Sequence, residues 1–253
     1  MDTLELKQSG DLARIVLRRP PLNYLNIELL RAFQAGMEGL GETPDCRALI
    51  VEAEGKAFSA GLDIQEQTRE NIFLLIEQFH SVARALTAFP RPTIAVVRGM
   101  ALGAGNELAA CCDFIFASEA ASFGQPEVKF GSIPSLAPLL LPSLIGSRHT
   151  LELILTGDFI SAKEAQHLGL VHAVSPDDRL WDSVEAFVSK FQRLSLAVVQ
   201  LALQSARSFR VRALEEHVRE AESIYLNQLM DLEDSAEGAK AFLEKRPPKW
   251  QNR

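Results

Sequence analysis

The sequence predicts an α/β protein with a helical C-terminal region. In the first 176 residues, short β-branched runs alternate with segments whose apolar residues repeat at helical spacing. From about residue 177 onward the strand-like runs stop, and charged segments follow that carry leucines or alanines on one face. Because strands separated by helices are typical of α/β proteins, we expect one α/β core followed by helices.

The elements of the core follow from these two periodicities. Strands are expected over residues 3–7, 13–19, 47–53, 93–99 and 170–176. Asn26 precedes an amphipathic helix over 27–40, and a second helix over 69–88 ends at a pair of prolines. Residues 113–124 predict a short hairpin-like pair of strands.

The C-terminal part is predicted to be helical throughout. Four helices are expected there, over 178–193, 195–207, 211–230 and 233–245. The division between core and helical part falls near residues 176–195, and the chain ends in a polar tail with one aromatic anchor, Trp250.

Composition and charge argue against several classes of protein. The 253 residues are 47% hydrophobic, which is enough for one substantial core. The formal net charge of -7 argues against a sustained basic surface for nucleic acid. No apolar run reaches the roughly 18 residues that a membrane span needs, and the N-terminus resembles neither a signal nor a transit peptide. We therefore expect no membrane and no nucleic-acid partner.

The cysteines predict neither a metal site nor a disulfide framework. Cys46, Cys111 and Cys112 are odd in number and lack the spacing of metal ligands. Cys111 and Cys112 lie in an apolar helical context, where buried thiols are expected. A reducing, cytoplasmic location fits this pattern.

One glycine-rich stretch, GMALGAGNEL over 99–108, leads from a predicted strand into a predicted helix. It supplies only the first two glycines of the dinucleotide-binding pattern, because Leu108 stands where the third is needed. It also places Glu107 near a helix N-terminus, and no acid follows a strand at the distance that a ribose would require. The stretch is therefore a weak match to a phosphate loop.

Two glutamates are candidates for acid–base chemistry. Glu107 precedes an apolar run, and Glu127 follows twenty residues later between Pro126 and Val128. Two buried carboxyls close together push their pKa values apart, so that one is ionised and the other protonated. From the residues alone, a helix cap at Glu107 and a solvated loop residue at Glu127 are the more ordinary roles, because acids are common in loops.

A second turn, KAFSAGLD over 56–63, follows a predicted strand and precedes a helix. The backbone amides after its tight turn, together with that of Ala104, are positioned to stabilise a developing oxyanion. An ordinary strand-to-helix turn is the simpler interpretation. Ser59 lacks the GxSxG pattern of an activated nucleophile, and no histidine is tied to it by spacing.

Together these stretches resemble the crotonase superfamily, the enoyl-CoA hydratase/isomerase family, over nearly the whole chain. The resemblance rests on six motifs in the family's order: Arg19-Pro20 with Asn23, KAFSAGLDI (56–64), RPTIAVVRGMALGAGNELAACCD (91–113), ASFGQPEVKFGSIP (121–134), LTGDFISAKEAQHLGLV (155–171) and DSAEGAKAFLEKRPPKW (234–250).

The resemblance implies a fold and an assembly. The family fold is a spiral of repeated ββα units followed by helices that help to form trimers, often paired into hexamers. We therefore expect a spiral core with the active site over residues 1–190 and a C-terminal helical region for trimerisation over 191–253.

The resemblance also implies site residues. The family's two oxyanion amides fall on Leu62 and Ala104, and its two hydratase glutamates fall on Glu107 and Glu127. The segment that contacts coenzyme A falls on residues 60–65. The substrate-binding residues predicted within this segment are Ala60, Asp63, Ile64 and Gln65. Coenzyme A is part of the substrate, and no separate cofactor is expected.

The function that these residues predict is hydration of an enoyl-CoA thioester in fatty acid or aromatic compound degradation. Isomerisation is the nearest alternative, because one glutamate suffices for it. An inactive homologue would not need both acids, and an RNA-binding homologue would need a lysine-rich helix, whereas residues 27–41 contain one arginine and no lysine.

The acyl pocket is predicted to depart from that of straight-chain hydratases. Residues 133–138 read IPSLAP, where those enzymes commonly read IPGAGG. Bulky Leu136 and rigid Pro138 suggest a reshaped pocket, and the motifs around the two glutamates resemble those of cyclic dienoyl-CoA hydratases.

Overall fold

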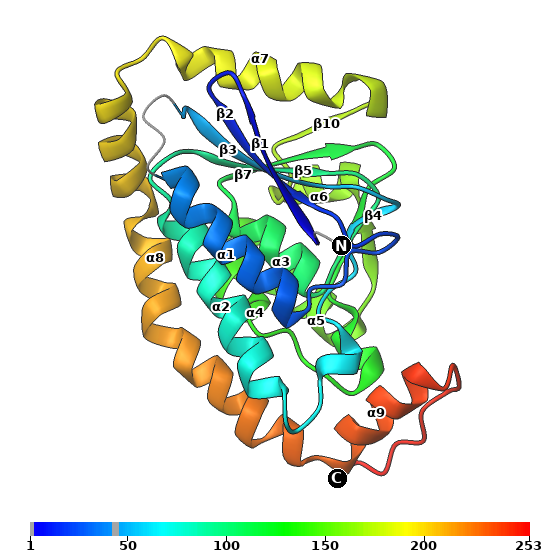
Figure 1. The fold of residues 1–253 in the computed structure, drawn as a ribbon. Helices are drawn as coiled ribbons and strands as arrows, with labels where there is room; N and C mark the ends of the chain where they lie inside the picture. The colour runs from blue at the N-terminus through cyan, green and yellow to red at the C-terminus, as the bar shows by residue number, and fades with distance from the viewer. Residues whose placement is uncertain (1–2, 42–45) are drawn as a thin grey trace.

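The computed structural model describes residues 3–41 and 46–253 and confirms the α/β class (Figure 1). Its larger sheet has six strands in the order β1-β2-β3-β5-β7-β10. These are β1 (Leu4–Ser9), β2 (Leu12–Leu17), β3 (Ala48–Ala53), β5 (Thr93–Val97), β7 (Phe114–Ser118) and β10 (Ala173–Ser175). The pair β1–β2 is antiparallel, and each of the other neighbours is parallel.

A smaller sheet carries the strands that lead into the candidate site. Its order is β4 (Ala57–Ser59), β6 (Met100–Leu102), β8 (Ser122–Gly124) and β9 (Phe159–Ser161). Strands β4, β6 and β8 each follow a strand of the larger sheet after a short turn, and helices then return the chain. This repeat is the predicted ββα unit.

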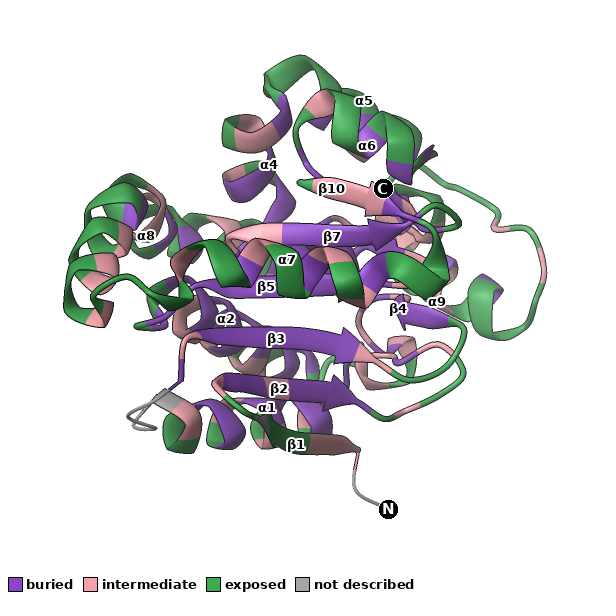
Figure 2. Ribbon diagram, turned by 90° about the horizontal axis from the view of Figure 1, so that it is seen from above, coloured by how far each residue is buried: buried purple, intermediate pink, exposed green. Residues whose placement is uncertain are grey.

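Alternating side chains give the larger sheet two buried faces. In β3, Leu49 and Val51 belong to the main core, whereas Ala48 and Ile50 face α7 (Leu180–Gln192) and pack near its Val184. Successive residues of a strand point to opposite faces, so a strand buried on both sides reads as a continuous apolar run. Figure 2 shows these strands buried beneath α7, whose outer face is exposed.

The main core lies between the larger sheet and the helices on the opposite side from α7 (Figure 1). These helices are α1 (Ile27–Gly41), α2 (Ile72–Ala88) and α3 (Ala104–Cys111), with α4 (Ala137–Ile145), α5 (Ser147–Thr156) and α6 (Ala162–Leu168) following along the chain. Short 3-10 turns connect several elements: η1 (Ile64–Glu66), η2 (Pro126–Phe130), η3 (Asp177–Arg179) and η4 (Leu229–Asp231).

The C-terminal helices differ from the prediction. One helix, α8 (Leu196–Asn227), replaces the two expected over 195–207 and 211–230, and α9 (Glu233–Leu243) follows it. No glycine or proline interrupts residues 208–210, so the backbone hydrogen bonds continue through them. By length and composition no single described helix could cross a membrane, and one bent pair, 177–192 with 196–231, meets that criterion jointly.

The predicted hairpin at 113–124 is also wrong. Its two strands, β7 and β8, belong to different sheets and pair with different neighbours. The strand expected over 93–99 likewise ends at Val97, and the chain enters the smaller sheet at Met100. Turn residues locate a change of direction, but long-range pairing decides which sheet a strand joins.

Candidate active site

Glu107 is buried at the junction of two helices. It lies one turn into α3, and its side chain is 1% exposed. Its Oε1 accepts hydrogen bonds from the backbone nitrogens of Leu136 and Ala137, each at 2.6 Å. These residues begin α4. Glu107 therefore caps the N-terminus of α4 rather than that of its own helix.

Glu127 faces the same region from η2; the residue as a whole is partly exposed, whereas its carboxyl group is surrounded by protein. Its carboxylate lies against Gly103, where a Cβ atom would stand 2.7 Å from Glu127 Oε1. Gly103 also has a φ of +54°, which other residues rarely adopt. Glycine is therefore required at this turn both by its conformation and by the glutamate beside it.

Burial shifts both carboxyl groups toward the protonated form. It raises the pKa of Glu107 to about 7, although the backbone N–H groups of Ala137 and Leu136 oppose this shift. Burial, followed by repulsion from Glu107, raises the pKa of Glu127 well above its ordinary range. Two neighbouring carboxyls without a paired cation favour one shared proton near neutral pH.

Glu127 is oriented by two buried amides that the sequence reasoning missed. With the Gln125 amide oriented to match its neighbours, Nε2 donates to both Glu127 oxygens at 3.1 and 3.2 Å. Gln125 Oε1 then accepts from Asn106 Nδ2 at 3.1 Å. Both amides are 0% exposed. Gln125 stands two residues before Glu127 in FGQPE, so its proximity was open to prediction, but its burial was not.

The two turns with candidate amide donors meet backbone to backbone. A Cβ on Gly61, whose φ is +102°, would lie 3.6 Å from the backbone nitrogen of Ala104. Within residues 3–41 and 46–253, the N–H groups of Leu62 and Ala104 donate to no backbone or side-chain acceptor. Ala104 begins α3 in a right-handed conformation, so its methyl group is accommodated. Ser59 Oγ accepts from Gly61 N at 3.2 Å and thereby stabilises the turn.

A cavity of about 230 Å³ joins these groups, and we call it the glutamate cavity. Glu107, Glu127, Leu62 and Ala104 all line it. Its remaining wall is mainly apolar and includes Leu22, Tyr24, Met100, Leu102, Phe130, Ile133 and Phe159. The structure thus brings the four predicted reaction-site residues to one cavity.

The predicted substrate-binding segment is only partly in this cavity. Ala60 and Ile64 line it, whereas Gln65 lines a neighbouring cavity. Asp63 lies outside both linings, because its Oδ2 pairs with Arg19 Nη2 at 2.7 Å and its Oδ1 accepts from Gln65 N at 3.1 Å. Its local role is to fix the turn that presents Leu62.

Comparison with known proteins identifies the family. The family model described as enoyl-CoA hydratase/isomerase matches residues 7–253. The chain belongs to the enoyl-CoA hydratase/isomerase family. It is 32% identical over 248 residues to cyclohexa-1,5-dienecarbonyl-CoA hydratase of Thauera aromatica, covering 98% of this chain and 96% of that protein. It is 34% identical over 256 residues to a probable enoyl-CoA hydratase of Bacillus subtilis, with 99% of each chain covered.

Solved structures agree with this membership. An enoyl-CoA hydratase from Mycobacterium avium subsp. paratuberculosis superposes with a TM-score of 0.88 at 26% identity, covering 99% of each chain. Members of the enoyl-CoA hydratase/isomerase family share the crotonase fold, and membership supports a crotonase-type reaction on an acyl-CoA.

Two residues far along the chain complete the lining of the glutamate cavity. Tyr225 of α8 and Phe242 of α9 line the glutamate cavity, although both lie beyond residue 190. Phe242 packs edge-on against Phe130 with 4.9 Å between ring centroids. Nothing in the helical periodicity of these segments marks either residue as part of a site, because their position depends on how α8 and α9 fold back.

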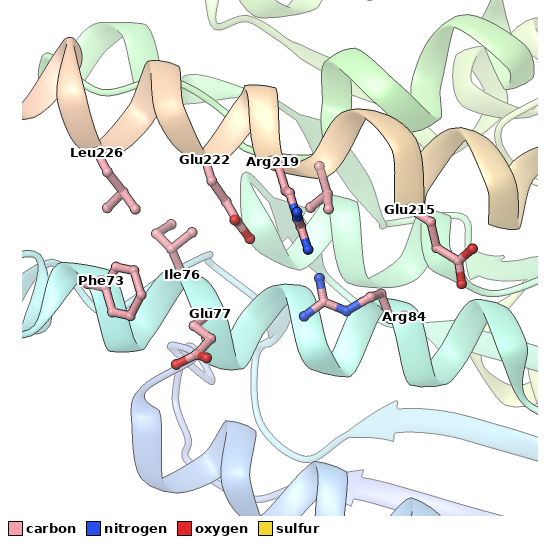
Figure 3. Close-up of a pocket in the computed structure, with 9 residues that line it drawn as sticks. Phe73, Ile76, Glu77, Arg84, Glu215, Arg219, Glu222 and Leu226 are labelled. Atoms are coloured by element: carbon pink, nitrogen blue, oxygen red, sulfur yellow. The ribbon is translucent and has the colours of Figure 1, made fainter.

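A second hollow, of about 380 Å³, lies between α2 and α8 (Figure 3). Figure 3 shows Arg84 of α2 and Arg219 of α8 extending toward each other across it, with Glu215 and Glu222 nearby. Its lining lacks the two neighbouring turns with candidate backbone donors that line the glutamate cavity. Within the described part of the chain, no group of His, Cys, Asp and Glu side chains is arranged to hold a metal ion.

Proposed function

We propose that the protein is an enoyl-CoA hydratase that adds water across the α,β double bond of a CoA thioester. The observation that carries this proposal is the pair of carboxyls, Glu107 and Glu127, which face one cavity with raised pKa values and no cation between them. A reaction that must both take and give a proton needs two such groups.

The thioester oxygen is proposed to bind the N–H groups of Leu62 and Ala104. Both amides line the cavity, and the second belongs to the first turn of α3, where the helix dipole adds positive potential. When water attacks Cβ, the electrons of the double bond move toward the thioester oxygen as an enolate. Each donor aimed at this charge contributes about 10²–10³ in rate.

The two glutamates then divide the proton transfers. Glu107 accepts hydrogen bonds from the backbone nitrogens of Leu136 and Ala137, which stabilise its ionised form, and it is proposed as the base that accepts the proton of the attacking water. Glu127 is proposed as the acid that protonates Cα. A protonated Glu127 still accepts from Gln125 through its carbonyl oxygen. Protons and electrons balance, because one water is consumed, and the proton that Glu107 took up passes to Glu127 before the next turnover.

Isomerisation of the double bond is the alternative within the family. One carboxyl suffices to move a proton between α and γ carbons, so the second buried carboxyl favours hydration. The 32% sequence identity to cyclohexa-1,5-dienecarbonyl-CoA hydratase supports a cyclic dienoyl-CoA as one substrate to test. No separate cofactor is proposed, since CoA is carried by the substrate.

The proposal includes an assembly and a location. Apolar residues on α8, Val198, Leu201 and Phe209, are 64%, 67% and 71% exposed, and burying such a face stabilises association. We propose that residues 191–253 take part in a homotrimer or homohexamer, and that the protein acts in the cytoplasm without nucleic-acid or membrane partners.

In the deciding experiment, the protein is incubated with linear and cyclic unsaturated CoA esters, and the mass of each product is measured by mass spectrometry. Hydration adds about 18 mass units, whereas isomerisation moves the double bond at unchanged mass. If every ester gave a product of unchanged mass with a moved double bond, the proposed reaction would be isomerisation and not hydration. No turnover of any ester would contradict both.

A further inference from the structure

The glutamate cavity shares a wall with a second cavity of about 590 Å³, which we call the outer cavity. The outer cavity lies among η1, the end of α8, η4 and α9. Five residues line both cavities: Ile64, Gln67, Phe130, Ser132 and Tyr225. The two spaces are therefore adjacent, and these side chains form the partition between them.

Tyr225 is hydrogen-bonded within this partition. Its side chain is buried, and its hydroxyl lies 3.0 Å from Ser132 Oγ and 3.5 Å from Gln67 Oε1. The three residues come from α8, the segment after η2 and the end of η1. Burial raises the pKa of Tyr225 to about 12, so its hydroxyl stays neutral and keeps its proton for hydrogen bonding.

The charges around the glutamate cavity indicate which side receives the acyl group. Near Tyr24 and Phe242 it adjoins a groove that is lined by Lys129, Lys245 and Arg246. Lys129 is paired with Asp158, and Arg246 is paired with Glu237 and Glu244. Lys245 pairs with no acid among the described residues and suits a phosphate of CoA. The outer cavity instead combines apolar Met230, Leu232 and Leu243 with acids and bases of both signs. With the phosphates on the side of Lys245, an alkyl chain extends toward Tyr225, and Gln65, which the sequence predicted to contact CoA, then lies on the acyl side.

We infer that Tyr225, held by Ser132 and Gln67, is a gate that limits the length of the acyl group. With the gate closed, the acyl group is confined to the glutamate cavity. With the ring removed, the chain passes into the outer cavity and contacts its apolar wall. This inference rests on the proposed acyl-CoA function, and Tyr225 acts on specificity rather than on the reacting atoms.

The experiment measures binding of saturated acyl-CoA esters, which have no double bond to hydrate. Butanoyl-, octanoyl- and dodecanoyl-CoA are titrated into the wild type, Tyr225→Ala and a control, His217→Ala, by calorimetry. His217 is exposed on the same helix and lines neither cavity. Tyr225→Ala is expected to shift the ratio of dodecanoyl to butanoyl affinity by about tenfold or more toward the long chain. His217→Ala should keep the wild-type ratio.

Ser132→Ala and Tyr225→Phe test the hydrogen bonds while leaving the ring in place. Both variants are expected to shift the ratio of dodecanoyl-CoA to butanoyl-CoA affinity toward the long chain, but by less than Tyr225→Ala does. If Tyr225→Ala does not fold, these two variants test the proposal in its place. An unchanged length profile in folded Tyr225→Ala, or in both milder variants if it does not fold, would overturn the gate.

The gate and the hydratase proposal fail separately. If no ester gains the mass of water but acyl-CoA affinities still depend on Tyr225, the reaction assignment is wrong and the gate stands. If hydration proceeds and the affinity profile ignores Tyr225, the gate is wrong and the reaction assignment stands.

Discussion

Two buried carboxylate sites lie at opposite ends of α3, and they use the same chemical group differently. Near its start, Glu107 and Glu127 line a cavity and have raised pKa values. Just past its end, Asp113 accepts from Arg207 Nε at 2.7 Å, Arg210 Nη2 at 3.0 Å and Thr93 N at 2.8 Å. There, burial alone would raise the pKa of Asp113, but the bonds from Arg207 outweigh it and the pKa falls below its ordinary value.

The difference separates a structural acid from a candidate reactive one. Asp113 fastens α8 to the N-terminal ends of the interior strands β5 and β7, and its charge is paired with two arginines. The glutamates have only neutral amide donors, so their charge can change during a reaction. Cationic partners fix a protonation state, whereas a buried pair without them can exchange a proton.

The largest expected effect is loss of turnover in Glu107→Gln. Gln retains an oxygen that accepts from Leu136 and Ala137, so folding should persist. Loss of the proposed base is expected to lower kcat about 10²–10⁴-fold in a hydration assay. Glu52→Gln is the matched control, because Glu52 is buried and paired with Arg14 outside the cavity. Wild-type hydration by folded Glu107→Gln would remove Glu107 from the mechanism.

Asp113→Ala should act on stability instead. It leaves Arg207, which is 6% exposed, without its carboxylate. Breaking a buried pair in this way is expected to lower the free energy of unfolding by about 3–5 kcal/mol in urea titrations. Asp182→Ala removes the exposed pair with Arg179 and should cost about 0–1 kcal/mol. Equal losses in the two variants would contradict the structural role of Asp113.

The two sites should also respond oppositely to pH. Because the folded-state pKa of Glu107 is raised from 4.5 to about 7, the folded protein binds more protons than the unfolded chain between these values, and stability falls as pH rises through them. Glu107→Gln removes this penalty. Its free energy of unfolding relative to wild type should therefore increase by about 1–3 kcal/mol between pH 5 and pH 8.

The contribution of Asp113 to stability depends on pH in the opposite direction. Its folded-state pKa is lowered, so its stabilisation is present above the ordinary value of 3.8 and is lost as pH falls through the folded pKa. Asp113→Asn should therefore differ most from wild type at neutral pH and converge with it in acid. If the free energies of unfolding of the Glu107 and Asp113 variants, each relative to wild type, changed with pH in the same direction, the proposed difference between the two sites would be contradicted.

The smallest effect is expected in the hollow between α2 and α8. Arg219 is exposed there and is not part of the glutamate cavity (Figure 3). Arg219→Ala should change the free energy of unfolding by less than about 0.5 kcal/mol and leave kcat/KM within about twofold of wild type. A large loss of kcat/KM would mean that this hollow contributes to the reaction.

The sequence by itself determined the α/β class, because this depends on the local periodicity of apolar residues. The ββα repeat and the assignment of the two glutamates and two amide turns to one site came from the resemblance of its motifs to the family. The sequence also predicted a strand over 93–99 and strand residues within 113–124, but it joined β7 and β8 into a hairpin and divided α8 in two.

Only the tertiary structure decided which strands share a sheet, how Glu107 caps α4, and why Tyr225 and Phe242 reach a cavity built by residues 22–159. Burial and proximity between distant segments set these features. The same long-range packing removes water from the glutamates and raises their pKa values, while it brings two arginines to Asp113. The sequence supplies the acids, and their surroundings in the fold determine what each acid does.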